Sequence, residues 1–229
     1  MGEILLKDKE IAVPGEVLAK GMDYIPAGGT FRENEDIIAN QLGMVSINGR
    51  LVKLVPLTGI YVPKANDIVI GKVVDVTFSS WLLDINSPNL AMLSIRDATE
   101  YIERNADLTQ YYDYGDIVAA KVTKVTRNKA IDLSTKGPGL RKLNEGQIVE
   151  VTPSKVPRII GKQASMITMI KDATDCKIIV GQNGRVWIHG VDPDKEIVAT
   201  AAIMKIEHES HTEGLTDRIK EFLDKELKK

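Results

Sequence analysis

The sequence predicts a multidomain protein that is rich in β-strands and carries one α+β domain toward its C-terminal end. Short runs of Val and Ile alternate with Gly, Pro and Asn turns as far as residue 137. From residue 145 the pattern changes to strand, helix, helix, strand, strand, helix, and a final amphipathic helix follows. Apolar residues make up 43 % of the 229 residues, enough to form real cores. We therefore expect four parts, at residues 1–62, 63–137, 145–209 and 210–229.

Residues 1–62 are predicted to form a small β domain. An Asn48-Gly49 pair lies between two strand-like runs, 43–47 and 50–55. This is the strongest short signal for a β-hairpin, because the two turn residues need a positive φ. The segment has no histidine, no paired carboxylates and no phosphate-binding loop. A scaffold or docking surface is therefore favoured over an active site.

Residues 63–137 are predicted to form a small five-stranded barrel. A short helical turn is expected at 97–104, between the third and fourth strands. Five strands with a helical connection in this place follow the order of the OB fold. Gly71, inside the first strand, indicates the bend that such a barrel needs. The expected strands cover residues 67–77, 81–85, 90–95, 115–125 and 129–134.

The α+β domain, residues 145–209, ends in a long helix for which Asp192 is the predicted N-cap and Pro193 the first residue. Before it, two strands are predicted to pair around Asn183-Gly184. The apolar positions expected to pack this helix on the sheet are Ile197, Ala201, Ala202, Met204 and Ile206. The last helix, within 210–229, has one apolar face made of Leu215, Ile219, Phe222 and Leu223.

The charge pattern excludes a uniformly basic coat, because the net charge is −2. Two local basic stretches nevertheless stand out. Residues 115–142 hold seven Lys or Arg against two Asp, and residues 151–171 hold four Lys or Arg and no acid. Such stretches are usually solvated surface, but two of them in an acidic protein favour a polyanionic partner.

Other kinds of site find little support in the sequence. The single cysteine, Cys176, can form no internal disulfide and no thiolate cluster, and it is expected to be a core residue. His208 and His211 lack further ligands at a metal-binding spacing. No apolar run approaches the roughly 18 residues of a membrane helix. We expect no catalytic residue, metal or cofactor, no membrane contact, and a cytoplasmic location.

The stretch Gly161-Lys162-Gln163-Ala164 resembles the G-x-x-G loop of KH domains, and the order of elements around it is similar to a type I KH domain. In that family the loop lets a nucleic-acid backbone approach the chain amides. The resemblance implies RNA contacts by Arg158, Gly161 and Lys162. The second glycine of the pattern is replaced by Ala164, so the domain could serve assembly instead of RNA binding.

Residues 63–137 resemble the S1-type OB fold, which stacks bases on aromatic side chains and follows phosphates with Lys and Arg. The usual aromatic positions are non-aromatic here, because the matching run is Ser79-Ser80-Trp81-Leu82. By alternation, Phe78 and Trp81 could face the barrel core. Tyr111, Tyr112 and Tyr114 are expected to pack between domains. RNA contact is therefore assigned to Lys121, Lys124, Arg127 and Lys129, with Arg96 as a secondary contact.

The whole chain is similar to the S1/KH-containing RNA-binding cap subunits of the archaeal exosome. The resemblance rests on Ile11–Leu18, Val156–Gly161, Val180–Arg185 and Gly214–Ile219, in this order. It implies three cap subunits on a hexameric ring of ribonuclease-like subunits, with the N-terminal and KH domains docked on the ring. It also implies capture of single-stranded RNA, delivered 3′ end first, a bias toward adenine-rich tails, and no catalysis by the cap.

Three alternatives stay open at this point. A fragment of polynucleotide phosphorylase would carry the same two domains, but in the opposite order and with phosphorolytic core domains. A free-standing translation or RNA-chaperone module would bind RNA without a ring. A purely structural cap would bind the ring and little RNA. The sequence leaves open the RNA preference, the face that lines the pore, and whether the cap is homotrimeric or mixed.

Overall fold

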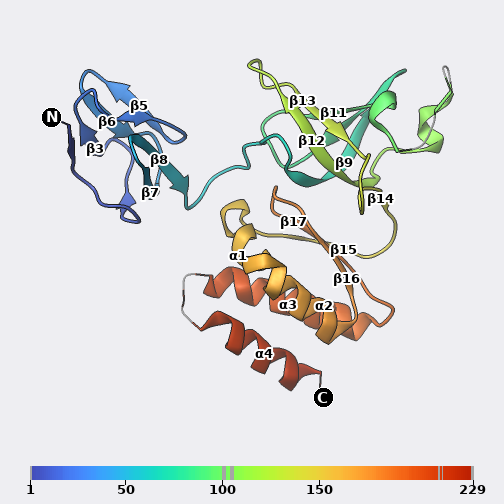
Figure 1. Ribbon diagram of the computed structural model, residues 1–229. Coiled ribbons are helices and arrows are strands. Elements are labelled where there is room, and N and C mark those ends of the chain that lie inside the picture. The colour runs from blue at the N-terminus through green and yellow to red at the C-terminus, as the bar shows by residue number, and fades with distance from the viewer. Residues whose placement is uncertain (1, 100–101, 104–105, 211, 213, 228–229) are drawn as a thin grey trace. The chain divides into compact units, whose positions relative to one another are not determined.

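The computed structural model describes residues 2–227 apart from 100–101, 104–105, 211 and 213. It divides into two compact units, Met1–Gly59 and Ile60–Lys229 (Figure 1). The first unit is a small β domain. The second contains a barrel, an α+β domain that packs against it, and a C-terminal helix.

The N-terminal unit consists of two four-stranded sheets, ordered β1-β3-β6-β5 and β2-β7-β8-β4. Their inner faces form one core around Leu18, Ile37, Val45 and Leu54. The strands are β1 (Glu3–Ile4), β2 (Ile11–Ala12), β3 (Val17–Lys20), β4 (Ile25–Pro26), β5 (Thr30–Glu33), β6 (Asp36–Ala39), β7 (Gly43–Asn48) and β8 (Leu51–Pro56).

The predicted hairpin is confirmed as the β7–β8 pair, but its turn lies one residue later than expected. Asn48 pairs with Leu51, so the turn residues are Gly49 and Arg50. Only Gly49 has a positive φ, 61°. A type II′ turn needs a positive φ at its first position only, and glycine meets that need without strain. Asn48 therefore ends the strand instead of forming the turn.

The barrel confirms the predicted five strands in the OB order. β9 pairs with β10 and β12, β11 pairs with β10, and β13 closes the barrel between β11 and β12. A short sixth strand, β14 (Lys142–Leu143), pairs with the first residues of β12. The barrel strands are β9 (Ile68–Val76), β10 (Ser80–Asp84), β11 (Ala91–Ser94), β12 (Ile117–Val125) and β13 (Ile131–Ser134).

The helical turn predicted at 97–104 is misplaced. Residues 100–101 and 104–105 of that prediction lie outside the described residues, and the described turns are 3₁₀ segments at Ile95–Asp97 and Leu108–Gln110. Each begins at a side chain that caps it: Ser94 accepts a hydrogen bond from the amide of Arg96, and Asp107 accepts one from the amide of Thr109. Local capping thus sets where the turns begin.

Gly71 and Trp81 shape the barrel interior. A Cβ atom on Gly71 would lie 2.9 Å from Cδ2 of Leu83 and 3.1 Å from Cγ2 of Ile85, so β9 approaches these side chains closely where the residue is glycine. Trp81 is fully buried, and its indole N–H donates to the carbonyls of Leu108 and Tyr112, at 3.2 and 3.0 Å. The prediction that Trp81 could face the core is therefore confirmed.

The α+β domain has the predicted order, with a three-stranded sheet arranged β15-β17-β16. Helices cover one face of this sheet (Figure 1). The elements are β15 (Gln147–Glu150), α1 (Val156–Ile160), α2 (Ser165–Thr174), β16 (Lys177–Val180), β17 (Arg185–His189) and α3 (Pro193–Glu209), with 3₁₀ turns at Pro153–Lys155 and Lys162–Ala164.

The predicted start of α3 is confirmed, but its predicted apolar face is partly wrong. Asp192 accepts a hydrogen bond from the amide of Asp194, as an N-cap should, and Pro193 is the first helical residue. Ile197 and Ala201, however, are exposed. Glu207 accepts hydrogen bonds from the amide and hydroxyl of Thr152, at 2.9 and 2.8 Å, which is consistent with this rotation of the helix. The buried positions are Ala199, Ala202, Ile203 and Ile206.

The C-terminal helix α4 (Leu215–Glu226) belongs to the core of the α+β domain. Its residues Leu215, Ile219 and Leu223 are buried against α2 and α3, and Phe222 is half-buried, as the sequence predicts. Arg218 of α4 also pairs with Glu209 at the end of α3, at 3.3 Å.

The sheet of the α+β domain is covered on both faces. Ile178, Val186 and Ile188 point toward the helices. Trp187, on the opposite face, packs with Ile70 of the barrel. The indole N–H of Trp187 donates to the carbonyl of Glu145 at 2.8 Å. Because both faces are buried, the α+β domain and the barrel are joined by a core and not by a flexible linker.

Asn183 fastens this junction at the tip of the β16–β17 hairpin. Its fully buried amide donates to the carbonyls of Ile70 and Ile85, at 2.8 and 3.0 Å, and accepts from the amide of Ile70 at 3.2 Å. Strand β10 ends at Asp84, which pairs with Lys72 of β9. Ile70 lies two residues further along β9, so no residue of β10 is left to bond its amide and carbonyl. The Asn183 side chain takes the place of the missing strand residue.

An ion pair supports the same junction at its edge. The guanidinium of Arg185 donates to the carbonyl of Asp84 at 2.7 Å and to its carboxylate at 2.6 Å. Burial alone would raise the pKa of Asp84. The hydrogen bonds from Arg185 and from the amide of Asn86 outweigh that effect, so the pKa of Asp84 is lowered. The carboxylate therefore stays charged at neutral pH and keeps its partner.

Candidate nucleic-acid interface

The β12–β13 hairpin carries four of the predicted contact residues. Lys124, Arg127 and Lys129 are exposed, and Lys121, on β12, is half-buried. The tip is a tight turn in which the amide of Lys129 donates to the carbonyl of Thr126 at 3.0 Å. Within the described residues, none of these four cations forms an ion pair. They are available to an anionic ligand.

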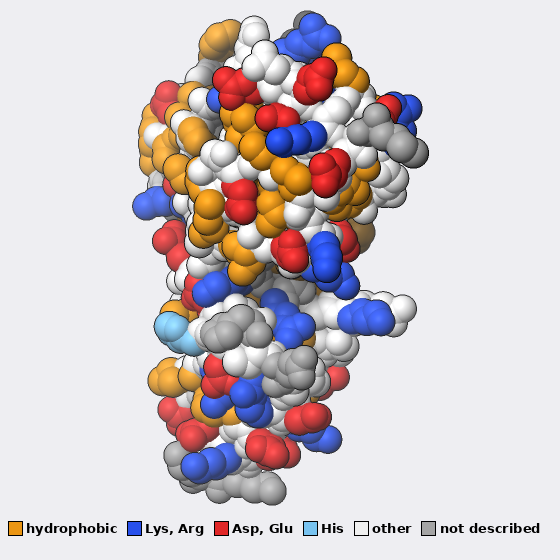
Figure 2. Space-filling view, turned by 90° about the vertical axis from the view of Figure 1, so that its left-hand side faces the viewer, with side chains coloured by type: hydrophobic (Ala, Val, Ile, Leu, Met, Phe, Trp, Pro, Cys, Tyr) orange, Lys and Arg blue, Asp and Glu red, His pale blue; other side chains and the backbone are white. Residues whose placement is uncertain are grey.

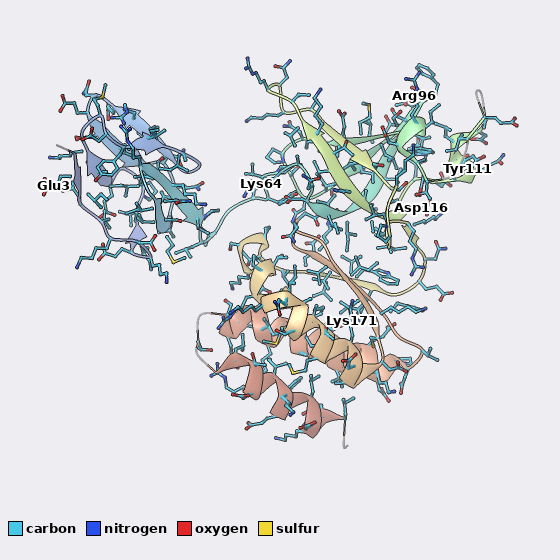
Figure 3. All side chains as sticks on the ribbon, viewed as in Figure 1. Glu3, Lys64, Arg96, Tyr111, Asp116 and Lys171 are labelled. Carbon is cyan, nitrogen blue, oxygen red and sulfur yellow. The ribbon has the colours of Figure 1, made fainter. Side chains whose placement is uncertain are left out.

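Arg96 is not brought together with the cations at the tip of this hairpin. It follows β11, at the end of the barrel where β10 begins, because Ser94 pairs with Ser80. The tip of the β12–β13 hairpin lies at the opposite end, because Val125 pairs with Ile131, and Ile131 pairs with Ala91 at the start of β11. Lys121 lies nearer to Arg96, because it pairs with Ser134, whose hydroxyl donates to the carbonyl of Asp97. Figure 3 shows the separation, with Arg96 on one side of the barrel and Lys64, which precedes β9, on the other. The sequence offers no signal for this separation, since it depends on strand pairing.

The barrel surface between the two ends carries charges of both signs. The register places Asp75, Leu82, Met92 and Asp132 in one row across β9, β10, β11 and β13. OB folds commonly bind nucleic acid across such strands. The same row continues to Lys124 of β12, which pairs with Asp132, so it offers two carboxylates, two aliphatic side chains and one cation. Exposed cations are found at both barrel ends, and Lys72 lies between them in the middle of β9.

Among the aromatic residues, Phe78 stands apart. It is 94 % exposed in the turn between β9 and β10, so the expectation that it could face the core is wrong. Residues in a turn do not follow strand alternation. Tyr111 and Tyr112 pack inside the barrel core and not between domains, and only Tyr114 of that group is exposed. Phe78 is thus a candidate contact that the sequence pattern alone does not reveal.

The loop at residues 161–164 keeps an unusual backbone although its last residue is alanine. Gly161, Gln163 and Ala164 have positive φ values of 76°, 52° and 62°. Lys162 is exposed at the tip. Arg158, also exposed, donates to the carbonyl of Thr212 at 3.1 Å. One of the two cations predicted for this loop is therefore engaged within the protein, while the other projects freely.

Replacing Ala164 by glycine is expected to stabilise the protein by about 0.5–1 kcal/mol. A residue with a Cβ pays about 1 kcal/mol or more in the left-handed region, and glycine does not. The loss of a half-buried methyl group offsets part of this gain. Urea unfolding followed by circular dichroism measures the difference. Ala201→Gly, on the exposed face of α3, is the matched control and should destabilise by about 1 kcal/mol; destabilisation by Ala164→Gly as well would contradict the strain argument.

Other groups give little chemistry. Cys176 is buried, and burial raises the pKa of its thiol, so it behaves as a core residue. In the described part of the chain, no group of three or more His, Cys, Asp or Glu side chains could hold a metal ion. His211 lies outside the described residues. Within the same described ranges, no helix is both long and apolar enough to cross a membrane.

A closed five-stranded barrel fused to a βααββα domain defines a protein of the class that combines an S1 domain with a KH domain. Comparison with known families agrees: residues 60–124 match the S1 domain of Rrp4, and residues 146–194 match a KH domain. The chain is 48 % identical to the exosome complex component Rrp4 of Thermococcus kodakarensis, over 97 % of this chain and 88 % of that protein. It therefore belongs to the Rrp4 family of exosome complex components.

Further relatives give the same result. The Rrp4 component of Methanothermus fervidus is 44 % identical over 96 % of this chain and 97 % of its own length. Among solved structures, a crystal structure described as an exosome complex RNA-binding protein superposes with a TM-score of 0.66 at 38 % identity. That match covers 74 % of this chain and 98 % of the solved chain.

Proposed function

We propose that this protein is a non-catalytic RNA-binding cap subunit of an exosome. Three copies dock on a hexameric ring of ribonuclease-like subunits, capture single-stranded RNA and deliver its 3′ end to the ring, with a bias toward adenine-rich tails. The protein works in the cytoplasm. The proposed parts are 1–62 for docking, 63–137 for RNA contact, 145–209 as the KH domain and 210–229 as its helical extension.

The observation that carries the proposal is the apolar surface of the N-terminal unit. Of the 22 large apolar side chains that are exposed in the described residues, 11 lie in the N-terminal unit. Pairing of strands aligns Ile11, Met44 and Val55 in one row on the outer face of the sheet β2-β7-β8-β4, and Ile25 is adjacent to Leu51 on the same face. An apolar face of this kind supports a protein-docking role. Figure 2 shows apolar side chains spread over the surface of this unit, in the upper half of the view.

The cations of the β12–β13 hairpin support the RNA-binding part of the proposal. Three of the four are exposed and have no acidic partner within the described part of the chain. Electrostatic contacts of this kind hold a phosphate backbone without sequence preference. Each copy needs to bind only weakly, because three copies on one ring would present three such hairpins to one strand. The junction at Asn183 supports a KH domain that moves together with the S1 barrel.

Docking is tested by mixing the full chain with a purified exosome ring and a labelled single-stranded RNA, followed by size-exclusion chromatography with light scattering. We expect co-elution at three copies per ring and stronger RNA retention than with the ring alone. The double variant Ile11→Glu, Val55→Glu should lose co-elution, because it places two charges on the docking face. Phe31→Glu, on the outer face of the other sheet, is the matched control and should still co-elute.

The same experiment separates the alternatives. Stoichiometric capping without added RNA retention would leave a purely structural cap. Retention of RNA by the free protein without any ring binding would indicate a free-standing RNA-binding module, and the cap proposal would fail. Release of nucleotides by the protein without the ring would indicate an enzyme instead.

A further inference from the structure

The end of the barrel that carries Arg96 also carries the most exposed aromatic side chain in the described chain. Phe78 occupies the β9–β10 turn, and the carbonyl of its neighbour Ser79 accepts a hydrogen bond from the amide of Ile95 at 3.2 Å. Phe78 precedes Ser79 and Arg96 follows Ile95, so this hydrogen bond brings Phe78 and Arg96 close together. Lys136 reaches the same place, since its ammonium group donates to the carbonyl of Arg96.

The turn that presents Phe78 is held firmly. The amide and the hydroxyl of Thr77 donate to the carbonyl of Ser80, at 2.9 and 2.8 Å, and the amide of Ser80 donates back to the Thr77 hydroxyl at 3.0 Å. These bonds hold the backbone from which the ring projects, so less of the turn has to be ordered when the ring stacks on a ligand. The packing of the domain does not need the ring, because 94 % of its surface faces solvent.

The charges around Phe78 favour an anionic ligand. Arg96 and Lys136 are exposed, and neither forms an ion pair among the described residues. Asp97, which follows Arg96 in the chain, is half-buried. Asp75, which precedes Phe78 on β9, is exposed, and its carboxylate accepts a hydrogen bond from the hydroxyl of Tyr114 at 3.3 Å. The ligand that matches one flat apolar ring between two cations is a nucleotide, which has a base to stack and a phosphate to pair.

We propose that Phe78, Arg96 and Lys136 form a base-stacking site for one nucleotide of single-stranded RNA. The inference rests on the proposed RNA-binding function and adds a contact at the end of the barrel opposite the tip of the β12–β13 hairpin. One strand can reach both ends, because an OB fold contacts about 4–16 nucleotides. The hairpin holds phosphates, and the Phe78 site recognises the presence of a base.

Two probes test the site with the full chain: a short fluorescein-labelled oligoadenylate, and an abasic oligomer of the same length with the same number of phosphates. Phe78→Ala should weaken binding of the oligoadenylate about 5- to 100-fold, which is the range for loss of one stacked base. Its binding of the abasic oligomer should not change. The double variant Arg96→Ala, Lys136→Ala should weaken binding of both probes and reduce the salt dependence.

Two further variants make the result specific. Phe78→Trp should bind the oligoadenylate at least as tightly as the unchanged protein and should show fluorescence quenching when a base stacks on it. Leu90→Ala removes an exposed apolar side chain of the same barrel at its other end and should bind both probes normally. Thermal unfolding should be unchanged in Phe78→Ala, because the side chain packs against little of the protein.

The outcomes distinguish this inference from the proposed function. If Phe78→Ala binds the oligoadenylate as the unchanged protein does, or loses both probes equally, the stacking site is refuted while RNA binding stands. If the unchanged protein binds neither probe, alone or on the ring, the proposed RNA-binding function fails and the stacking site fails with it.

Discussion

Replacing Asn183 by alanine is expected to lower the free energy of unfolding by about 3–5 kcal/mol. The change leaves two carbonyl groups and one amide of the barrel without their partner, and each such buried group costs about 1–3 kcal/mol. Water that enters the space would recover part of the cost. The effect is large for a single side chain because the lost hydrogen bonds join residues about a hundred positions apart in the chain.

Asn183→Asp tests the chemistry more closely than the alanine variant does. A carboxylate of nearly the same shape can still accept from the amide of Ile70, but it cannot donate to the carbonyls of Ile70 and Ile85. It would also place a charge in a site with no exposed surface. We therefore expect Asn183→Asp to be at least as destabilising as Asn183→Ala at neutral pH.

Guanidinium unfolding gives the size of the effect, and native-state hydrogen exchange gives its place. Compared with the unchanged protein, both variants should show faster exchange at the amides of β9 and β17. Exchange in the N-terminal unit should change little. Gln182→Ala is the matched control, because Gln182 contacts the barrel through its backbone amide, which donates to the carbonyl of Ile68 at 2.7 Å. Equal losses in the Gln182 and Asn183 variants would show that the junction does not depend on the Asn183 side chain.

The role of Asn183 shows what local sequence signals cannot predict. Asn183-Gly184 correctly indicates a hairpin, and Gly184 has a positive φ of 82°. The asparagine itself, however, serves the barrel and not the turn. Pairing in a turn depends on neighbours in sequence, whereas the partner of Asn183 is a strand end that exists only after the barrel has closed. Buried hydrogen bonds over such distances leave no periodic pattern.

The elements themselves could be predicted to a large extent. The barrel strands, the two-helix segment around Gly161 and the start of α3 follow from β-branched runs, glycine spacing and a capping residue. The errors occur where two local signals compete. On α3, apolar residues lie on more than one face, and the residues that are buried are Ala199, Ala202, Ile203 and Ile206. In the N-terminal unit, glycine and not asparagine takes the turn position that needs a positive φ.

The candidate site could be predicted only in part, for a related reason. Charge clustering along the sequence indicates the β12–β13 hairpin, since its cations are neighbours in the chain. The pairing of β10 with β11 brings Phe78 close to Arg96, and no count of charge or aromatic residues contains that pairing. A contact site assembled from separate turns therefore becomes visible only in three dimensions.

Neutralising the β12–β13 hairpin is expected to have the largest effect on RNA affinity. In the variant with Lys121, Lys124, Arg127 and Lys129 all changed to Gln, binding of single-stranded RNA at low salt should weaken about 100-fold or more. Each lost phosphate contact should also reduce the slope of log K against log salt by about 0.7 for a single strand. Lys121 is half-buried, so most of the effect should come from the three exposed residues.

The slope carries more information than the affinity, because any loss of four positive charges weakens attraction to RNA at long range. The matched control therefore changes Lys7, Lys20, Lys177 and Lys220 to Gln, which are exposed and lie outside the barrel. Both variants have the same net charge. Fluorescence anisotropy at a series of salt concentrations should show a reduced slope for the hairpin variant and a nearly unchanged slope for the control. Equal slopes in the two variants would mean that the hairpin touches no phosphate, and RNA contact by the barrel would then depend on the end that carries Phe78 and Arg96.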